Sequence, residues 1–167
     1  MPATMLRWLS YIGAVTLLLL AFVAAEILLE QPMGLFSGSL PADLGFHSGK
    51  FKACPRKPNC VSSTTDAQAD AVHHIAPLRI SGSASAAWQR LGEILAASPR
   101  AKLITQQPDY LHAEFKSARM GFVDDVEFAL DANTGVIHVR SAARLGVRDF
   151  GVNRERIERI RRELAGT

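Results

Sequence analysis

The sequence predicts an α+β protein in which an N-terminal transmembrane helix precedes a small two-layer domain. Two observations predict this architecture: an uncharged apolar run over residues 8–25, and strand or helix periodicity from residue 72 onward in the order β-α-β-β-β-β-α. Because the links between strands are short, we expect an antiparallel sheet of about five strands with two helices on one face.

The apolar run is predicted to be a membrane anchor over residues 1–30. With its continuation past Glu26 it reaches roughly 27 to 33 Å, close to the thickness of a bilayer core. A secretory signal cleaved after Ala25 is the alternative. Arg7 precedes the run and Glu26 follows it, so the rest of the chain is expected outside the cytoplasm. The predicted location is the inner membrane, single-pass, with the C-terminal domain in the periplasm.

Residues 31–50 are rich in Gly, Pro and Ser and are predicted to be a linker, followed by an exported α+β domain over residues 51–167. The net charge of the chain is only +3. A balance this close to neutral does not indicate nucleic-acid binding, so the expected partners are the membrane, through the N-terminal helix, and an unknown envelope protein or lipid.

The stretch CPRKPNCVSS contains both cysteines of the chain, Cys54 and Cys60. In an oxidising compartment two cysteines this close in sequence are predicted to form a disulfide. A zinc site would need further ligands at suitable spacing, and a redox centre favours C-x-x-C at the start of a helix. Neither pattern is present, so no metal and no cofactor are expected.

The periodic segments predict the elements of the domain in order. Residues 72–81 read as a strand, and residues 83–99 as a helix with a serine cap and a stop at Pro99. Strands follow over 101–107, 109–117, 125–131 and 136–142, the last two joined by a hairpin turn. A final helix begins near Asn153, a residue type that favours the N-cap.

Alternation along the strands predicts that one face of the sheet is polar. The candidate residues on this face are His112, Glu114, Asp125, Glu127 and His138, with Tyr110, Lys116 and Arg140 beside them. The simpler interpretation is a solvated face with cross-strand ion pairs, such as Glu127 with Arg140. The alternative is a metal or acid–base site, which requires a register that brings these groups together.

Basic residues before the final helix form a second candidate site. Three arginines are spaced by four, and the free N–H groups at a helix start attract anions. The candidate ligand-binding residues are Arg140, Ser141, Arg144, Arg148, Asn153 and Arg154. In the alternative interpretation Arg144 pairs with Asp149 to order the loop, and Asn153 caps the helix.

Three separated motifs, CPRKPNCVSS, DYLHAEFKSARMGFVDDVEFAL and VRSAARLGVRDFGVNRERIERIRREL, resemble the domain-of-unknown-function 1499 family of bacterial envelope and plastid proteins. The resemblance runs from about residue 54 to residue 164 and implies a small exported or membrane-associated domain. It adds no catalytic residue. The chain matches the family pattern most closely around Asp124, Asp125, Glu127, Arg140, Ser141, Arg144, Gly151, Asn153 and Arg154.

These observations favour a membrane-anchored envelope domain that is not an enzyme and that binds a partner, an anion or a lipid headgroup. The second hypothesis is an envelope enzyme, hydrolase-like or metal-dependent, that uses the polar sheet face. An enzyme needs a nucleophile with its base, or a set of metal ligands, and neither stands at a recognisable spacing.

Overall fold

The computed structural model describes residues 3–28 and 36–166. Helix α1 covers Ala3–Leu28, 26 residues of mostly apolar sequence. Within the described part of the chain, no helix combines the length and the hydropathy that crossing a membrane requires. The predicted transmembrane helix is therefore not supported.

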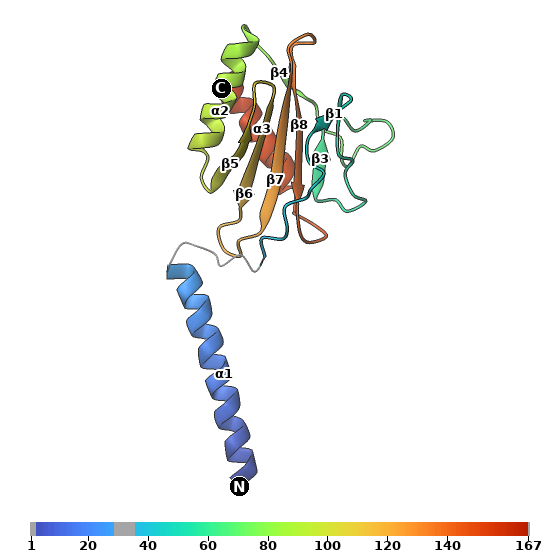
Figure 1. The fold of residues 1–167 in the computed structure, drawn as a ribbon. Coiled ribbons are helices and arrows are strands. Elements are labelled where there is room, and N and C mark those ends of the chain that lie inside the picture. The colour runs from blue at the N-terminus through green and yellow to red at the C-terminus, as the bar shows by residue number, and fades with distance from the viewer. Residues whose placement is uncertain (1–2, 29–35, 167) are drawn as a thin grey trace.

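The domain is built on a six-stranded antiparallel sheet (Figure 1). Its strands are β3 (Cys60–Ser62), β4 (Leu78–Arg79), β5 (Ala101–Gln106), β6 (Tyr110–Lys116), β7 (Val123–Asp131) and β8 (Val136–Ala143). The order across the sheet is β3-β8-β7-β6-β5, and β4 also pairs with β8. The α+β class and the antiparallel sheet are therefore confirmed.

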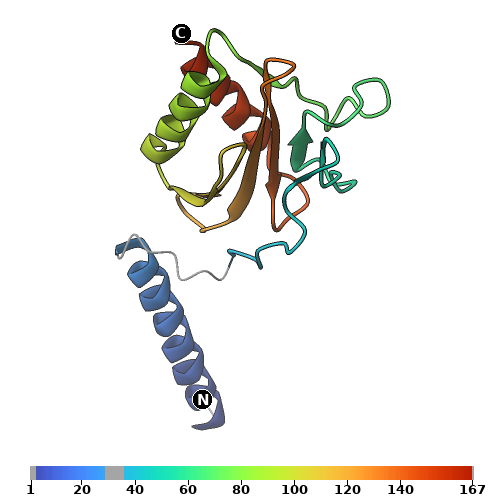
Figure 2. The same cartoon turned by 45° about the horizontal axis from the view of Figure 1, so that its top comes forward.

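Helices α2 (Ala84–Ala97) and α3 (Val152–Ala165) pack against the sheet and against each other (Figure 2). Both are amphipathic, and their apolar stripes meet the alternate side chains of the strands. Leu91 and Leu95 of α2 and Ile157 of α3 join Phe128 of β7 in one buried cluster, and each of these four side chains is at most 1% exposed. This cluster is the hydrophobic core.

Two predicted features are confirmed in atomic detail. Ser83 caps α2 through its side-chain oxygen, which accepts a hydrogen bond from the Ala86 N–H. The β7–β8 hairpin turns at Asp131, whose Oδ1 accepts hydrogen bonds from the N–H groups of Asn133 and Thr134. Both are short polar side chains that satisfy backbone donors where regular structure begins or ends.

The structure departs from the predicted strands at the N-terminal side of the domain. Of residues 72–81, only Leu78–Arg79 forms a strand, while His74 makes an isolated bridge to Ser62. The three-residue strand Cys60–Ser62, which pairs with β8, was not expected. A strand this short has too few residues to show alternation, so tertiary pairing determines it.

The predicted linker contains regular structure at its C-terminal end, and residues 31–35 lie outside the described residues. Strands β1 (Phe46–His47) and β2 (Lys50–Phe51) form a small hairpin. The Phe46 ring contacts the rings of Phe51 and His138, at centroid distances of 4.8 and 5.4 Å. This segment covers part of the sheet face that the helices leave open.

Candidate functional site

The register of the central strands brings the predicted polar residues together. His112 lies opposite Glu127, Glu114 opposite Asp125, and Glu127 opposite Arg140. The shared polar face is thus as expected, but its charged groups are not solvated. We call the buried group on this face the polar-face cluster; it consists of Tyr110, His112, Glu114, Asp125, Glu127, Arg140 and Arg144.

Glu127 is fully buried and accepts three hydrogen bonds. Arg140 Nη1 donates to its Oε2 at 2.9 Å, while the Tyr110 hydroxyl and the Gly45 N–H donate to its Oε1 at 2.8 and 2.7 Å. Arg140 Nε donates to the Lys52 carbonyl oxygen at 3.0 Å. Gly45 and Lys52, both in the part of the chain that precedes β3, therefore supply two of the bonds that stabilise this ion pair, and the pairing of Glu127 with Arg140 was predicted.

Asp125 is the centre of the other half of the polar-face cluster. Arg144 binds it in a bidentate manner, with Nε donating to Oδ2 at 2.8 Å and Nη2 to Oδ1 at 2.6 Å. Arg144 also donates to Glu114, and His112 Nε2 lies 2.8 Å from Asp125 Oδ1. The Asp125 side chain is 2% exposed, so little water competes for these bonds.

The electrostatic environment favours the charged forms of this pair. Burial opposes ionisation of Asp125, but hydrogen bonds from Arg144 and His112 outweigh it and hold the pKa of Asp125 below its usual value. The hydrogen bond to Asp125 likewise raises the pKa of Arg144. Burial, with the nearby Glu127 carboxylate, raises the pKa of Tyr110, which therefore acts as a hydrogen-bond donor at neutral pH.

A second buried polar group lies on the opposite face of the sheet, beneath α3. Arg156 Nη2 donates to Asp124 Oδ2 at 2.6 Å, its Nη1 donates to Ser141 Oγ and Asn153 Oδ1, and its guanidinium lies 4.8 Å from the centroid of the Phe115 ring. We call these four hydrogen-bonded residues, Asp124, Ser141, Asn153 and Arg156, the helix-face cluster. Burial raises the pKa of Asp124, and Arg156 only partly opposes this shift.

The loop before α3 is held differently from the prediction. The helix begins at Val152, and Asn153 is 0% exposed inside the helix-face cluster instead of at the cap. Asp149 performs the capping, since its carboxylate accepts hydrogen bonds from the Gly151 and Asn153 N–H groups. The alternative pairing of Arg144 with Asp149 is wrong, because Arg144 binds carboxylates across the sheet.

Most residues of the predicted anion site are occupied by internal contacts. Arg140 and Arg144 belong to the polar-face cluster, while Ser141 and Asn153 belong to the helix-face cluster on the other side of the sheet. Arg154 Nη2 donates to the carbonyl oxygens of Val72 and His74. Arg148 is exposed in the β8–α3 loop. The structure therefore separates these residues and does not gather them around one pocket.

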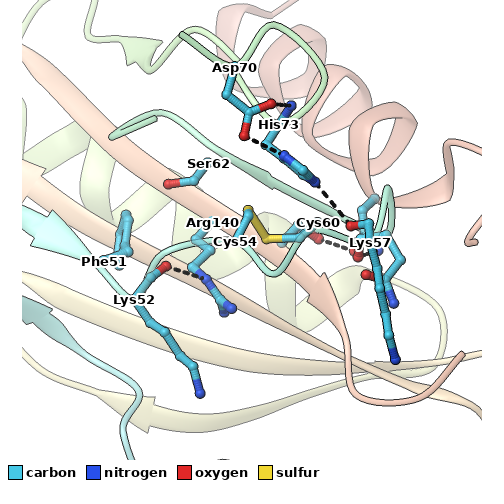
Figure 3. The surroundings of a disulfide bond; sticks show 12 residues. Phe51, Lys52, Cys54, Lys57, Cys60, Ser62, Asp70, His73 and Arg140 are labelled. Atoms are coloured by element: carbon cyan, nitrogen blue, oxygen red, sulfur yellow. Dashed lines mark hydrogen bonds and ion pairs between the residues drawn. A yellow bond between two sulfur atoms is a disulfide. The ribbon is translucent and has the colours of Figure 1, made fainter. Parts of the chain in front are cut away.

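The Cys54–Cys60 disulfide closes a small loop that contacts the β8–α3 loop (Figure 3). His73 lies between two partners, with Nε2 3.0 Å from the Lys57 carbonyl oxygen and Nδ1 2.6 Å from Asp70. Burial disfavours the charged imidazole of His73, but the hydrogen bonds to the Lys57 carbonyl oxygen and to Asp70 outweigh burial and raise the pKa of His73. The predicted disulfide is thus confirmed, and a buried histidine holds its loop in place.

Asn59, inside the disulfide loop, connects it to the β8–α3 loop. Its carbonyl oxygen accepts hydrogen bonds from the Ala143 N–H at 3.0 Å and from Asn153 Nδ2 at 3.1 Å. Its own Nδ2 donates to the Gly146 carbonyl oxygen at 3.2 Å, and Lys57 Nζ approaches the same oxygen. The disulfide loop therefore supports both ends of the segment that leads into α3.

Large apolar side chains are exposed at the end of the sheet where this segment lies. The β6–β7 and β8–α3 loops and the start of the covering segment all lie at this end (Figure 1). Phe36 packs on Phe122 with ring centroids 5.1 Å apart, and a Cβ at Gly38 would stand 3.2 Å from Leu145 Cγ. We define the apolar loop surface as Phe36, Met120, Leu145, Val147 and Phe150, which are 40–95% exposed.

One serine–histidine pair lies at the edge of the polar face. Ser63 Oγ is 3.2 Å from His138 Nδ1 and accepts a hydrogen bond from the Val139 N–H, while Phe46 stacks on the imidazole. No contact of His138 with a carboxylate is seen in the described residues, so the pair lacks the third group of a hydrolase triad. Nor does any group of three or more His, Cys, Asp or Glu side chains in that part of the chain have a metal-binding arrangement.

Comparison with known proteins identifies the family. A family model described as a protein of unknown function, DUF1499, matches residues 50–164, which is most of the chain. The chain therefore belongs to the DUF1499 family, as the resemblance of its three motifs implied. A search of curated proteins found no match.

Proposed function

We propose that this member of the DUF1499 family is a non-enzymatic binding module of the cell envelope that docks on an anionic lipid surface through its apolar loop surface. The buried clusters on the two sheet faces act as supports for this surface. The proposed binding site includes the loop between β8 and α3, which contains Arg144 and Arg148, two of the arginines that the sequence singled out.

The disulfide supports a location outside the reducing cytosol. Disulfides persist in oxidising compartments and are rare in cytosolic proteins of ordinary organisms. Cys54 and Cys60 are joined with a Cα–Cα distance of 5.6 Å, within the usual range. The periplasm is an oxidising compartment that fits this bond.

The observation that carries the proposal is the conformation and exposure of Phe150. This side chain is 95% exposed, and its φ of 55° lies in the left-handed region. A bulky residue in that region is strained by about 1 kcal/mol or more, and here no buried contact compensates for the strain. Strain without a packing benefit is typical of a residue selected for what it contacts outside the molecule.

The support beneath the loop makes Phe150 a fixed feature of the surface. Asp149, the preceding residue, is bound to Gly151 and Asn153, and Asn153 is itself completely buried. Asn59 binds the other end of the loop at Gly146. A loop anchored at both ends exposes its apolar residues in one arrangement, which lowers the entropy lost on binding.

The charge of the surface favours anionic lipid as the partner. Arg119 is exposed beside Met120, and Arg148 lies between Val147 and Phe150 on the neighbouring loop. The acidic residue of the same loop, Asp149, is engaged in capping α3. Exposed apolar residues interspersed with arginines are the pattern of segments that bind lipid headgroups and the top of the acyl chains.

We expect substitution of Val147 by serine to weaken binding of the full chain to phosphatidylcholine vesicles that contain phosphatidylglycerol. Loss of one buried apolar side chain predicts a decrease of about 10-fold or more in the partition constant. Arg148→Gln should decrease it by about 5-fold at low salt, since a basic side chain near such a surface contributes about 1 kcal/mol. The Arg148 effect should shrink as salt rises.

Val72→Ser is the matched control, because Val72 is 60% exposed and Val147 61%. Both variants retain α1, so any binding through that helix is the same in each. Vesicle co-sedimentation over a range of lipid concentrations measures the difference. Equal partition constants for Val147→Ser and Val72→Ser would contradict the docking proposal.

A further inference from the structure

An open groove of about 670 Å³ lies between α2 and the β5–β6 turn. Leu111 and Leu130 of the sheet form part of its floor, and Trp88 of α2 lines one side. Its volume is within the range of small-ligand sites. The β5–β6 and β7–β8 turns are at the end of the sheet opposite to the apolar loop surface (Figure 1). A ligand in this groove would therefore not interfere with docking of the apolar loop surface.

The lining of the groove is aromatic and rich in amides but carries no charge. Gln89, Gln106 and Gln107 contribute three carboxamides and Ser85 contributes a hydroxyl, and none of the ten lining residues is charged. Each carboxamide offers two donors and one acceptor. An anionic ligand would lose water here without meeting a countercharge, and a purely apolar ligand would bury these amides without partners.

The indole of Trp88 is held in place as one wall of the groove. Its Nε1–H donates to the Gln107 carbonyl oxygen at 3.4 Å, and the ring packs partly against the hydrophobic core. The Gln106 amide lies beside α2 at Gly92: a Cβ atom added to Gly92 would stand 3.9 Å from Gln106 Nε2. A flat aromatic surface is thus flanked by amide groups from the neighbouring turn.

We propose that this groove binds a neutral glycan. A sugar ring has an apolar C–H face that can lie on an indole, and its hydroxyl and acetamido groups at the edge match carboxamide donors and acceptors. The absence of charge from the lining is what selects uncharged sugars over phosphates or acidic glycans. In an envelope protein such a site would face polysaccharide on the side away from the lipid surface.

The test uses the full chain with Trp8→Phe, which leaves Trp88 as its one tryptophan because the sequence contains two. Chitotriose, the trimer of N-acetylglucosamine, is titrated while Trp88 emission is recorded, with calorimetry as a second readout. We expect a saturable change, and we expect Gln106→Ala and Gln107→Ala each to weaken binding by about 2- to 10-fold through the loss of a neutral hydrogen bond.

Gln68→Ala is the matched control, since Gln68 is an exposed glutamine outside the groove and should leave binding unchanged. Thermal melts of all variants show that each remains folded. An acidic comparator, sialyllactose, should bind more weakly than chitotriose. The proposal is overturned if chitotriose, maltotriose and cellotriose all fail to bind, if both groove substitutions leave binding unchanged, or if sialyllactose binds as well as chitotriose.

Discussion

Replacing Arg140 with methionine is expected to lower the free energy of unfolding by about 3 to 5 kcal/mol. The substitution keeps much of the side-chain volume but leaves Glu127 fully buried without a countercharge. Hydrogen bonds from Tyr110 and Gly45 remain, and these cannot replace the lost ion pair. Urea denaturation of the full chain measures the difference.

Two further variants separate the buried pair from a general effect of losing an arginine. Arg79→Met removes an exposed arginine from β4 and should change stability by less than about 0.5 kcal/mol. Adding Glu127→Gln to Arg140→Met removes the buried charge and should recover part of the loss, because an amide costs less to bury. A loss below about 1 kcal/mol for Arg140→Met would show that Glu127 is more hydrated than the structure indicates.

Arg144→Met is expected to have an effect of similar size, because it leaves Asp125 and Glu114 without the guanidinium that lies between them. A double-mutant cycle identifies its partner. Arg144→Met and Asp125→Asn should be non-additive by more than about 1 kcal/mol, whereas Arg144→Met and Asp149→Asn should be additive to within about 0.5 kcal/mol. The opposite result would restore the pairing of Arg144 with Asp149 that the sequence suggested.

The pH dependence of this pair follows from the direction of the pKa shift. The pKa of Asp125 is lower in the folded protein than in the unfolded chain, so Asp125 stabilises the fold at every pH above its unfolded pKa, about 3.9. That stabilisation is lost as the pH falls through the lower, folded pKa. The cost of Asp125→Asn should therefore be constant from pH 5 upward and decline below about pH 4, which denaturation curves at several pH values would show.

The sequence predicts which residues share the polar face, but it does not predict that they are buried. Alternation places Glu114, Asp125 and Glu127 on one face whichever neighbours pair, because the side-chain period of a strand is two. Burial depends on the part of the chain that precedes β3, where Phe46 stacks on His138 and the Gly45 N–H donates to Glu127. That segment has the glycine-rich composition of a linker and no periodicity, so no local signal distinguishes it from one.

The helix-face cluster could have been predicted from the sequence, but Asn153 was interpreted as the N-cap of the final helix instead of as part of its buried face. Asn153, Arg156, Ile157 and Ile160 stand at i, i+3, i+4 and i+7, the spacing of one buried helical stripe, and all four are buried. An arginine on that stripe requires a buried acidic partner. Asp124 and Asp125 are adjacent in a strand and therefore point to opposite faces, so this pair supplies one carboxylate to each buried cluster.

Phe150→Asn tests most directly the central claim, that the loop before α3 is shaped to contact an external surface. Asparagine tolerates the left-handed conformation of residue 150 far better than phenylalanine does. The account predicts that this variant is as stable as the natural protein or more stable, by up to about 1 kcal/mol, and that its partition onto phosphatidylglycerol-containing vesicles falls by about 10-fold or more. Unchanged vesicle binding would contradict the claim.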